Sequence, residues 1–206
     1  MARDTSPVVK QSRREGYALH PKAHKYLARK QGGPGEQGNG GGRRRQASQY
    51  ALQLREKQKV RRLYGLLEKQ FKNLFTKAAK MKGQTGENAL IMLESRLDNA
   101  VYRAGFASSR RAARQLVSHG HFMVNDRRVD VPSISLSPND QIAVRPKSHK
   151  SEYFKQLDDN SPKPSTTPGW LKVDRKKLSF SVASLPTRDD AEQDIQEQLI
   201  VEYYSR

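Results

Sequence analysis

Three arginines follow a pair of serines near the middle of the chain. Arg110, Arg111 and Arg114 come directly after Ser108-Ser109. If a helix begins at Ser109, the unpaired N–H groups of its first turn and the positive end of its dipole lie beside the guanidinium groups. Guanidinium groups also form paired hydrogen bonds with phosphate. The alternative is a set of surface arginines on an ordinary capped helix. We favour phosphate binding.

The histidines offer little catalytic or metal-binding chemistry. His20 and His24 have a spacing that can hold a metal on a helix, but Pro21 lies between them and no third ligand is nearby. His119 and His121 flank a glycine beside the arginines, where they suit contact with a phosphate or a base. No nucleophile or orienting partner supports a general-base role, and the chain has no cysteine. We therefore expect no metal, no cofactor and no catalytic residue.

A glycine-rich segment spans residues 32–42 and is followed by Arg43, Arg44 and Arg45. Residues 33–38 match G-x-G-x-x-G, but no strand precedes them, no capped helix directly follows, and Pro34 disrupts the backbone donors. We therefore reject a dinucleotide-binding loop. So much glycine indicates an extended segment that lies against a partner. The three arginines beside it suit contact with phosphates without reading base sequence.

The charge of the chain points to a polyanionic partner. Its 206 residues include 39 Lys and Arg against 21 Asp and Glu, a formal net charge of +18. Residues 1–62 carry +12 of this excess and residues 63–206 carry +6. Nucleic acid is the most obvious partner. A membrane would require an amphipathic anchor, a lipid site or about 20 consecutive apolar residues, and the chain has no such run. No apolar signal core follows Met1, so we do not expect secretion.

Helical spacing dominates the middle of the sequence. Ser48 is a candidate N-cap for a helix or helix pair that ends at Gly83, with apolar residues from Val60 to Ala78 on one face. A second helix is expected between Thr85 and Gly105, and a shorter one from Ser109 to about Ser118. Basic residues occupy the other faces of the first helix or pair: Arg55, Lys59, Arg62, Lys69, Lys72 and Lys80.

The hydrophobic period changes to that of strands after Gly120. Residues 121–124 and 127–131 predict a hairpin around Asn125-Asp126, and residues 141–144 predict a further strand. Residues 145–169 have the polar, proline-containing composition of a linker. The last residues predict an amphipathic acidic helix whose apolar stripe packs near Leu63, Leu67 and Phe71. The stripe consists of Ile195, Leu199, Ile200 and Tyr203.

An ordered set of short motifs runs through the whole chain. They are Ser12-Arg13-Arg14-Glu15-Gly16, Pro34-Gly35-Glu36-Gln37-Gly38, Gln53-Leu54-Arg55-Glu56-Lys57-Gln58-Lys59-Val60-Arg61-Arg62, Thr85-Gly86-Glu87-Asn88, Arg96-Leu97-Asp98-Asn99, Val101-Tyr102-Arg103, Ala113-Arg114-Gln115-Leu116-Val117-Ser118-His119, Val124-Asn125, Ser137-Pro138-Asn139-Asp140 and Leu199-Ile200-Val201-Glu202-Tyr203-Tyr204-Ser205. With these motifs the sequence resembles the bacterial small-subunit ribosomal protein S-four family over essentially its full length.

The resemblance implies an α+β fold with two domains. A mainly helical domain combines the N-terminal part with the C-terminal tail, and an S-four RNA-binding module of two helices and a small antiparallel sheet is inserted. The expected divisions are 1–47, an extended basic region; 48–93, the helical domain; 94–157, the RNA-binding module; 158–187, a linker and irregular segment; and 188–206, an acidic helix that packs back on the helical domain.

The resemblance also implies a structural role in the cytoplasmic small ribosomal subunit rather than an enzyme. Family members bind small-subunit rRNA at a helix junction of its 5′ domain early in assembly, contribute to mRNA entrance and, through ribosomal protein S-five, to decoding accuracy. No homo-oligomer or membrane is needed. Arg43, Arg44 and Arg45 are expected to contact mRNA where it enters. The expected rRNA contacts are Arg3, Lys10, Arg13, Arg14, Arg55, Lys59, Arg62, Lys69, Lys72, Arg96, Arg110, Arg111, Arg114 and His119.

The sequence differs from the family pattern in two places, and two alternative functions were considered. Many relatives carry N-terminal cysteines, some as a zinc site, which this chain lacks. Gln37 stands where the resemblance suggests a histidine, in a loop unusually rich in glycine. The same module occurs in RNA-modifying enzymes and tRNA synthetases, but these require a catalytic domain that the remaining residues do not supply. A free-standing translational repressor is compatible with ribosomal membership.

Overall fold

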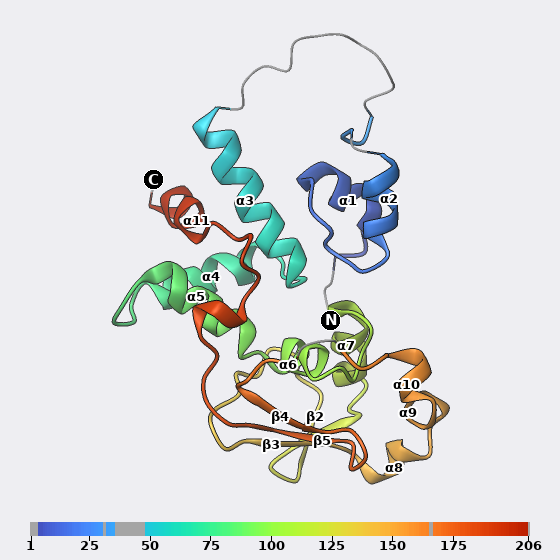
Figure 1. Cartoon of the computed structure of the whole chain (residues 1–206). Coiled ribbons are helices and arrows are strands. Elements are labelled where there is room, and N and C mark those ends of the chain that lie inside the picture. The colour runs from blue at the N-terminus through green and yellow to red at the C-terminus, as the bar shows by residue number, and fades with distance from the viewer. Residues whose placement is uncertain (1–3, 31, 36–47, 165–166, 206) are drawn as a thin grey trace. The chain divides into compact units, whose positions relative to one another are not determined.

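The computed structural model describes residues 4–30, 32–35, 48–164 and 167–205 (Figure 1). The chain forms two compact units. We call residues 1–88 with 194–206 the helical unit, and residues 89–193 the sheet unit. The second unit contains a five-stranded antiparallel sheet. The expected α+β fold, a mainly helical domain with an inserted helix-and-sheet module, is therefore confirmed.

We expected residues 1–47 to form an extended basic region, but the described part of this region is partly helical. It contains two helices, α1 (Val8–Glu15) and α2 (Ala23–Arg29). Gly16 ends α1 in the left-handed conformation (φ 64°), which glycine adopts without strain. The guanidinium group of Arg13 donates hydrogen bonds to the carbonyl oxygens of Gly32 and Gly33 at 2.9–3.1 Å. These contacts hold the described part of the following loop against α1.

The expected helix pair begins at Ser48, whose hydroxyl accepts a hydrogen bond from the amide of Ala51. The two helices are α3 (Gln49–Leu63) and α4 (Glu68–Ala78). They separate at Gly65, which has a positive φ of 65°. The buried face of α4 follows the predicted apolar spacing, with Phe71, Leu74, Phe75 and Ala78.

The C-terminal helix α11 (Glu197–Tyr204) packs against α3 and α4. Tyr204 lies against the rings of Phe71 and Phe75, with centroids 6.3 and 5.5 Å away. The side-chain amide of Gln53 donates to Glu202 at 2.9 Å. The bounds expected for this helix were wrong, because residues 188–193 belong to the sheet unit. There Arg188–Asp190 form a single 3-10 turn, η1.

The sheet unit places helices α6 (Leu97–Arg103) and α7 (Arg110–Ser118) on one face of its sheet (Figure 1). The strand order is β2-β1-β3-β5-β4. The expected helix over 85–104 is divided into α5 (Thr85–Glu94) and α6, because Arg96 leaves the helix to form a bridge with Ser135. The first three strands are β1 (Phe122–Val124), β2 (Arg127–Val129) and β3 (Gln141–Val144).

The expectation that residues 158–187 form a linker was wrong. They contain β4 (Leu171–Asp174) and β5 (Ser179–Val182), which complete the sheet. Phe180 of β5 lies opposite Ile142 of β3, and both are buried in the core. The apolar side chains of these strands alternate, as a strand with one buried face requires.

The polar segment before these strands contains three short helices, α8 (Pro146–His149), α9 (Glu152–Lys155) and α10 (Leu157–Asn160). They contribute Phe154 and Leu157 to the core, so this part of the expected linker is also built into the unit. No helix in the described part of the chain is both long and apolar enough to cross a membrane.

Candidate RNA-binding surface

Helix α7 separates apolar from basic side chains. Ser109 caps it, as predicted, by accepting a hydrogen bond from the amide of Ala112 at 3.2 Å. Ala113 and Val117 are buried in the core, while Arg111 is exposed. The helix therefore presents a basic face away from the sheet.

The neighbouring arginines Arg96 and Arg114 bind a carboxylate within the unit. Arg96, only 7% exposed, donates to both oxygens of Asp98 at 3.0 and 2.7 Å. Arg114 lies 3.3 Å from one of the same oxygens. Two of the arginines expected to contact rRNA are thus also parts of a structural ion cluster.

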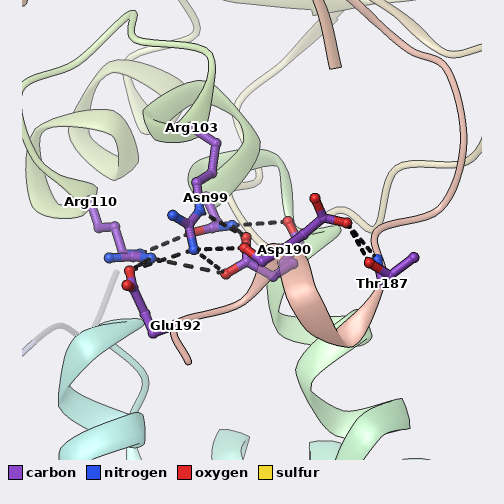
Figure 2. A network of polar contacts seen from close by, with 7 residues as sticks. Asn99, Arg103, Arg110, Thr187, Asp190 and Glu192 are labelled. Atoms are coloured by element: carbon purple, nitrogen blue, oxygen red, sulfur yellow. Dashed lines mark hydrogen bonds and ion pairs between the residues drawn. The ribbon is translucent and has the colours of Figure 1, made fainter. Parts of the chain in front are cut away.

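A second cluster joins α6 and α7 to the segment that follows η1 (Figure 2). Arg103 donates to both oxygens of the fully buried Glu94 at 2.9 and 3.0 Å. Asn99 donates to Glu94 at 2.7 Å and accepts from Arg110 at 2.8 Å. Arg110 also contacts Glu192 at 3.1 Å. The sequence analysis identified Arg110 but missed Arg103 and both carboxylates.

The β1–β2 hairpin adds two exposed arginines that the sequence analysis counted only as strand residues, Arg127 and Arg128. The turn residues Asn125 and Asp126 both have positive φ, as a two-residue hairpin turn requires. The guanidinium group of Arg128 lies over Gly120, where an added Cβ would be 2.6 Å from its Nε. The hairpin therefore brings basic side chains to the end of α7.

The two histidines beside α7 differ. His119 is exposed. His121 is partly buried, with its Nδ1 3.0 Å from the hydroxyl of Ser148. Burial lowers the pKa of His121, and the nearby His119 and Arg145 lower it further. Neutral His121 therefore suits a structural role, whereas His119 remains accessible to a ligand.

In the helical unit, several predicted RNA contacts surround one buried carboxylate. Glu15 on α1 is ion-paired with Arg62 and, at 3.3 Å, with Arg55, both on α3. Desolvation by burial raises the pKa of Glu15, although Arg62, Arg55 and Arg14 oppose the shift. Lys59 of the same helix pairs with Glu56 at 2.8 Å. Arg55 and Arg62 therefore join α3 to α1, whereas the Lys59 pair lies within α3.

Other predicted contacts lie on the surface or outside the described residues. The exposed side chains are Lys10, Arg14, Lys69 and Lys72. The predictions for Arg3, Arg43, Arg44 and Arg45 fall outside the described residues. His20 precedes α2 rather than sharing it with His24. Within the described ranges no group of three or more His, Asp or Glu side chains could hold a metal ion.

Comparison with known proteins accounts for both units. Residues 3–94 match the family model described as ribosomal protein S4/S9 N-terminal domain, and residues 95–142 match the S4 domain. The small ribosomal subunit protein uS4 of Roseiflexus sp. (strain RS-1) is 50% identical over the whole of both chains. The chain belongs to the uS4 family. The uS4 proteins of Chloroflexus aurantiacus (strain ATCC 29366 / DSM 635 / J-10-fl) and Chlorobium luteolum are 49% and 48% identical, also over the full length of each chain.

These relatives confirm the S-four resemblance and the expectation of a ribosomal protein rather than an enzyme. The S4-domain match ends at residue 142, within β3. Strands β4 and β5 therefore lie outside the matched segment, although they pair with β3 in the same sheet.

Proposed function

We propose that this uS4 protein binds small-subunit rRNA directly, at a helix junction of its 5′ domain, early in assembly of the subunit. The observation that carries this proposal is the basic surface of the sheet unit, which comprises Arg111 and His119 at α7 and Arg127 and Arg128 on the hairpin. Because the chain belongs to the uS4 family, we propose that the RNA bound by this surface is ribosomal RNA. Phosphate contacts of this kind position a protein on RNA and do not require base recognition.

The predicted contacts form two groups, one defined by exposure of the side chain and one by contacts with acidic or carbonyl groups of the chain. Lys10, Arg14, Lys69, Lys72, Arg111 and His119 are exposed in the free chain, so we propose that they contact rRNA directly. The other group is engaged with acidic or carbonyl groups of the chain, although Arg55 in it is also exposed, and comprises Arg13, Arg55, Lys59, Arg62, Arg96, Arg110 and Arg114. We propose that the ion pairs and hydrogen bonds of this group fix the positions of the surface elements. These residues also contact RNA where part of the side chain remains exposed.

A pair of charge-matched variants tests the sheet-unit surface. R111A with R128A removes two exposed cations from the proposed surface. K172A with K176A removes two exposed cations from β4 and the turn that follows it. Affinity for a transcript of the 5′ domain should fall about 10-fold or more in the first variant and much less in the second. Each lost phosphate contact removes the favourable free energy of releasing about one condensed counterion from the RNA. Equal losses would mean that only net charge matters.

We further propose roles beyond rRNA binding, suggested by the family. Arg43, Arg44 and Arg45 would contact mRNA where it enters the subunit, and ribosomal protein S-five would be a neighbour that links this protein to decoding accuracy. The support is the arginine run beside the glycine-rich segment. Arginines suit contact with the phosphates of many different sequences, because such contacts do not require base recognition.

A further inference from the structure

One carboxylate oxygen of Glu192 lies between two guanidinium groups. Its Oε1 is 3.1 Å from Nη2 of Arg110 and 3.5 Å from Nη2 of Arg103 (Figure 2). The Glu192 side chain is 29% exposed, whereas the two arginines are 12% and 18% exposed. An anion is thus held at the surface by two largely buried cations.

The two carboxylates of this cluster have different roles. Glu94 is fully buried, and Arg103 and Asn99 satisfy both of its oxygens. Breaking the contacts of Glu94 would leave its buried negative charge with neither a protein partner nor water, which is strongly unfavourable. Glu192 keeps contact with water and can exchange at low cost. Glu94 neutralises one of the two guanidinium charges, so a site for one further negative charge remains at the position of Glu192.

A phosphodiester has the charge and the acceptor geometry that this position requires. It carries one negative charge, and its oxygens can accept the hydrogen bond that Arg110 donates to Glu192 and lie within the field of Arg103. Arg110 is further fixed from two sides. Its guanidinium carbon lies 4.7 Å from the centre of the Tyr102 ring, and its Nε donates to Asn99. The donors therefore stay in place when the anion changes.

We propose that Glu192 occupies, in the free protein, an anion site formed by Arg103 and Arg110 that a backbone phosphate of rRNA takes in the complex. This inference rests on the proposed rRNA binding. The turn before Glu192 is held in shape by its own hydrogen bonds, since Asp190 accepts from the amide and hydroxyl of Thr187 at 2.8 and 2.9 Å. Arg103 also donates to the carbonyl oxygen of Asp190 at 3.2 Å. Rotation of the Glu192 side chain is therefore enough to open the site.

The displacement has a measurable consequence for affinity. A phosphate must compete with Glu192, so weakening the internal carboxylate should strengthen RNA binding. E192Q removes the charge. E192D keeps the charge but shortens the side chain by one methylene, which draws the carboxylate away from the arginines. D189N removes a charge from an exposed neighbour in the same segment and serves as the matched control.

The experiment compares full-length wild type and these variants for binding to a transcript of the 5′ domain at one fixed salt concentration. We expect E192Q to bind about 10-fold more tightly, which corresponds to one charge-assisted contact. E192D should also bind more tightly than wild type, and D189N should change affinity about 2-fold at most. Circular dichroism checks that each variant is folded.

Two results would overturn the inference. Equal gains for E192Q and D189N, with no gain for E192D, would show an effect of net charge alone. Weaker binding by E192Q would show that the carboxylate supports the RNA-bound state. Failure of the proposed function looks different, because wild type itself would then fail to bind the transcript.

Discussion

Arg103 and Glu94 form a bidentate ion pair in which the carboxylate is fully buried, with Nη2–Oε1 and Nε–Oε2 distances of 2.9 and 3.0 Å. Arg103 comes from α6 and Glu94 is the last residue of α5. The pair fixes the bend between these two helices. It also places Arg103 where it can reach the segment that follows η1.

Breaking this pair should destabilise the sheet unit. R103A leaves the buried carboxylate of Glu94 without its main partner, so we expect the free energy of unfolding to fall by about 3–5 kcal/mol. R111A removes an exposed arginine from α7 and should change it by less than about 0.5 kcal/mol. Trp170, the single tryptophan, is buried in this unit. Its fluorescence during urea denaturation reports the difference, and equal stability of the two variants would contradict the prediction.

The joint between α1 and α3 should weaken as pH rises. The pKa of Glu15 is raised from its ordinary value of 4.5, mainly by desolvation. The folded state therefore binds the proton more tightly than the unfolded chain. The stability that this provides is fully present below pH 4.5 and is lost as pH rises through the folded-state pKa.

Hydrogen exchange of the α1 amides measures this effect. The opening free energy of α1 in wild type should decrease relative to E15Q as pH rises from 4.5. E152Q removes a charge from an exposed glutamate of α9 and should leave the pH dependence of α1 as in wild type. A difference between wild type and E15Q that stays constant with pH would contradict the assignment.

Gly86 is required by the close approach of α5 and α11. A Cβ at this position would lie 2.6 Å from Cγ and 2.9 Å from Cβ of Glu197. We expect G86A to lower the melting temperature of the helical unit, at a cost of about 1–3 kcal/mol for overpacking. G169A adds the same methyl group where nothing lies within 4 Å. The prediction fails if G86A melts at or above the temperature of G169A.

The arginine run should act on mRNA rather than on assembly. Ribosomes that carry R43A, R44A and R45A together should assemble almost normally but unwind structured mRNA less well at its point of entrance. The matched control changes three exposed lysines of the sheet unit, Lys147, Lys150 and Lys155, to alanine. Normal unwinding by the arginine variant would argue against this role.

Local signals in the sequence predicted the elements that depend on neighbouring residues. The Ser109 cap predicted α7, and Asn125-Asp126 predicted the hairpin turn. Strands β4 and β5 were missed because their polar, proline-containing surroundings suggested a linker. Their alternating apolar residues become decisive only when β5 pairs with β3, which is distant in sequence.

The candidate RNA-binding surface likewise depends on contacts between residues that are distant in sequence. Residue type and spacing identified the arginines of α7, but not which of them remain open to a ligand. That depends on partners far along the chain, since Arg110 meets Glu192 across 82 residues. The helices α1 and α2 were missed for a related reason. Their stability depends on contacts such as Arg62 with Glu15, because such short helices are marginal alone.

The salt dependence of rRNA binding tests the central claim most directly. The full-length protein is titrated with a transcript of the 5′ domain of small-subunit rRNA at several salt concentrations. If roughly six to ten phosphates are neutralised, affinity should fall by about 10³–10⁵-fold between roughly 50 and 200 mM salt, because each contact releases condensed counterions. An affinity that stays constant across this range would contradict the proposal that the basic surfaces bind rRNA.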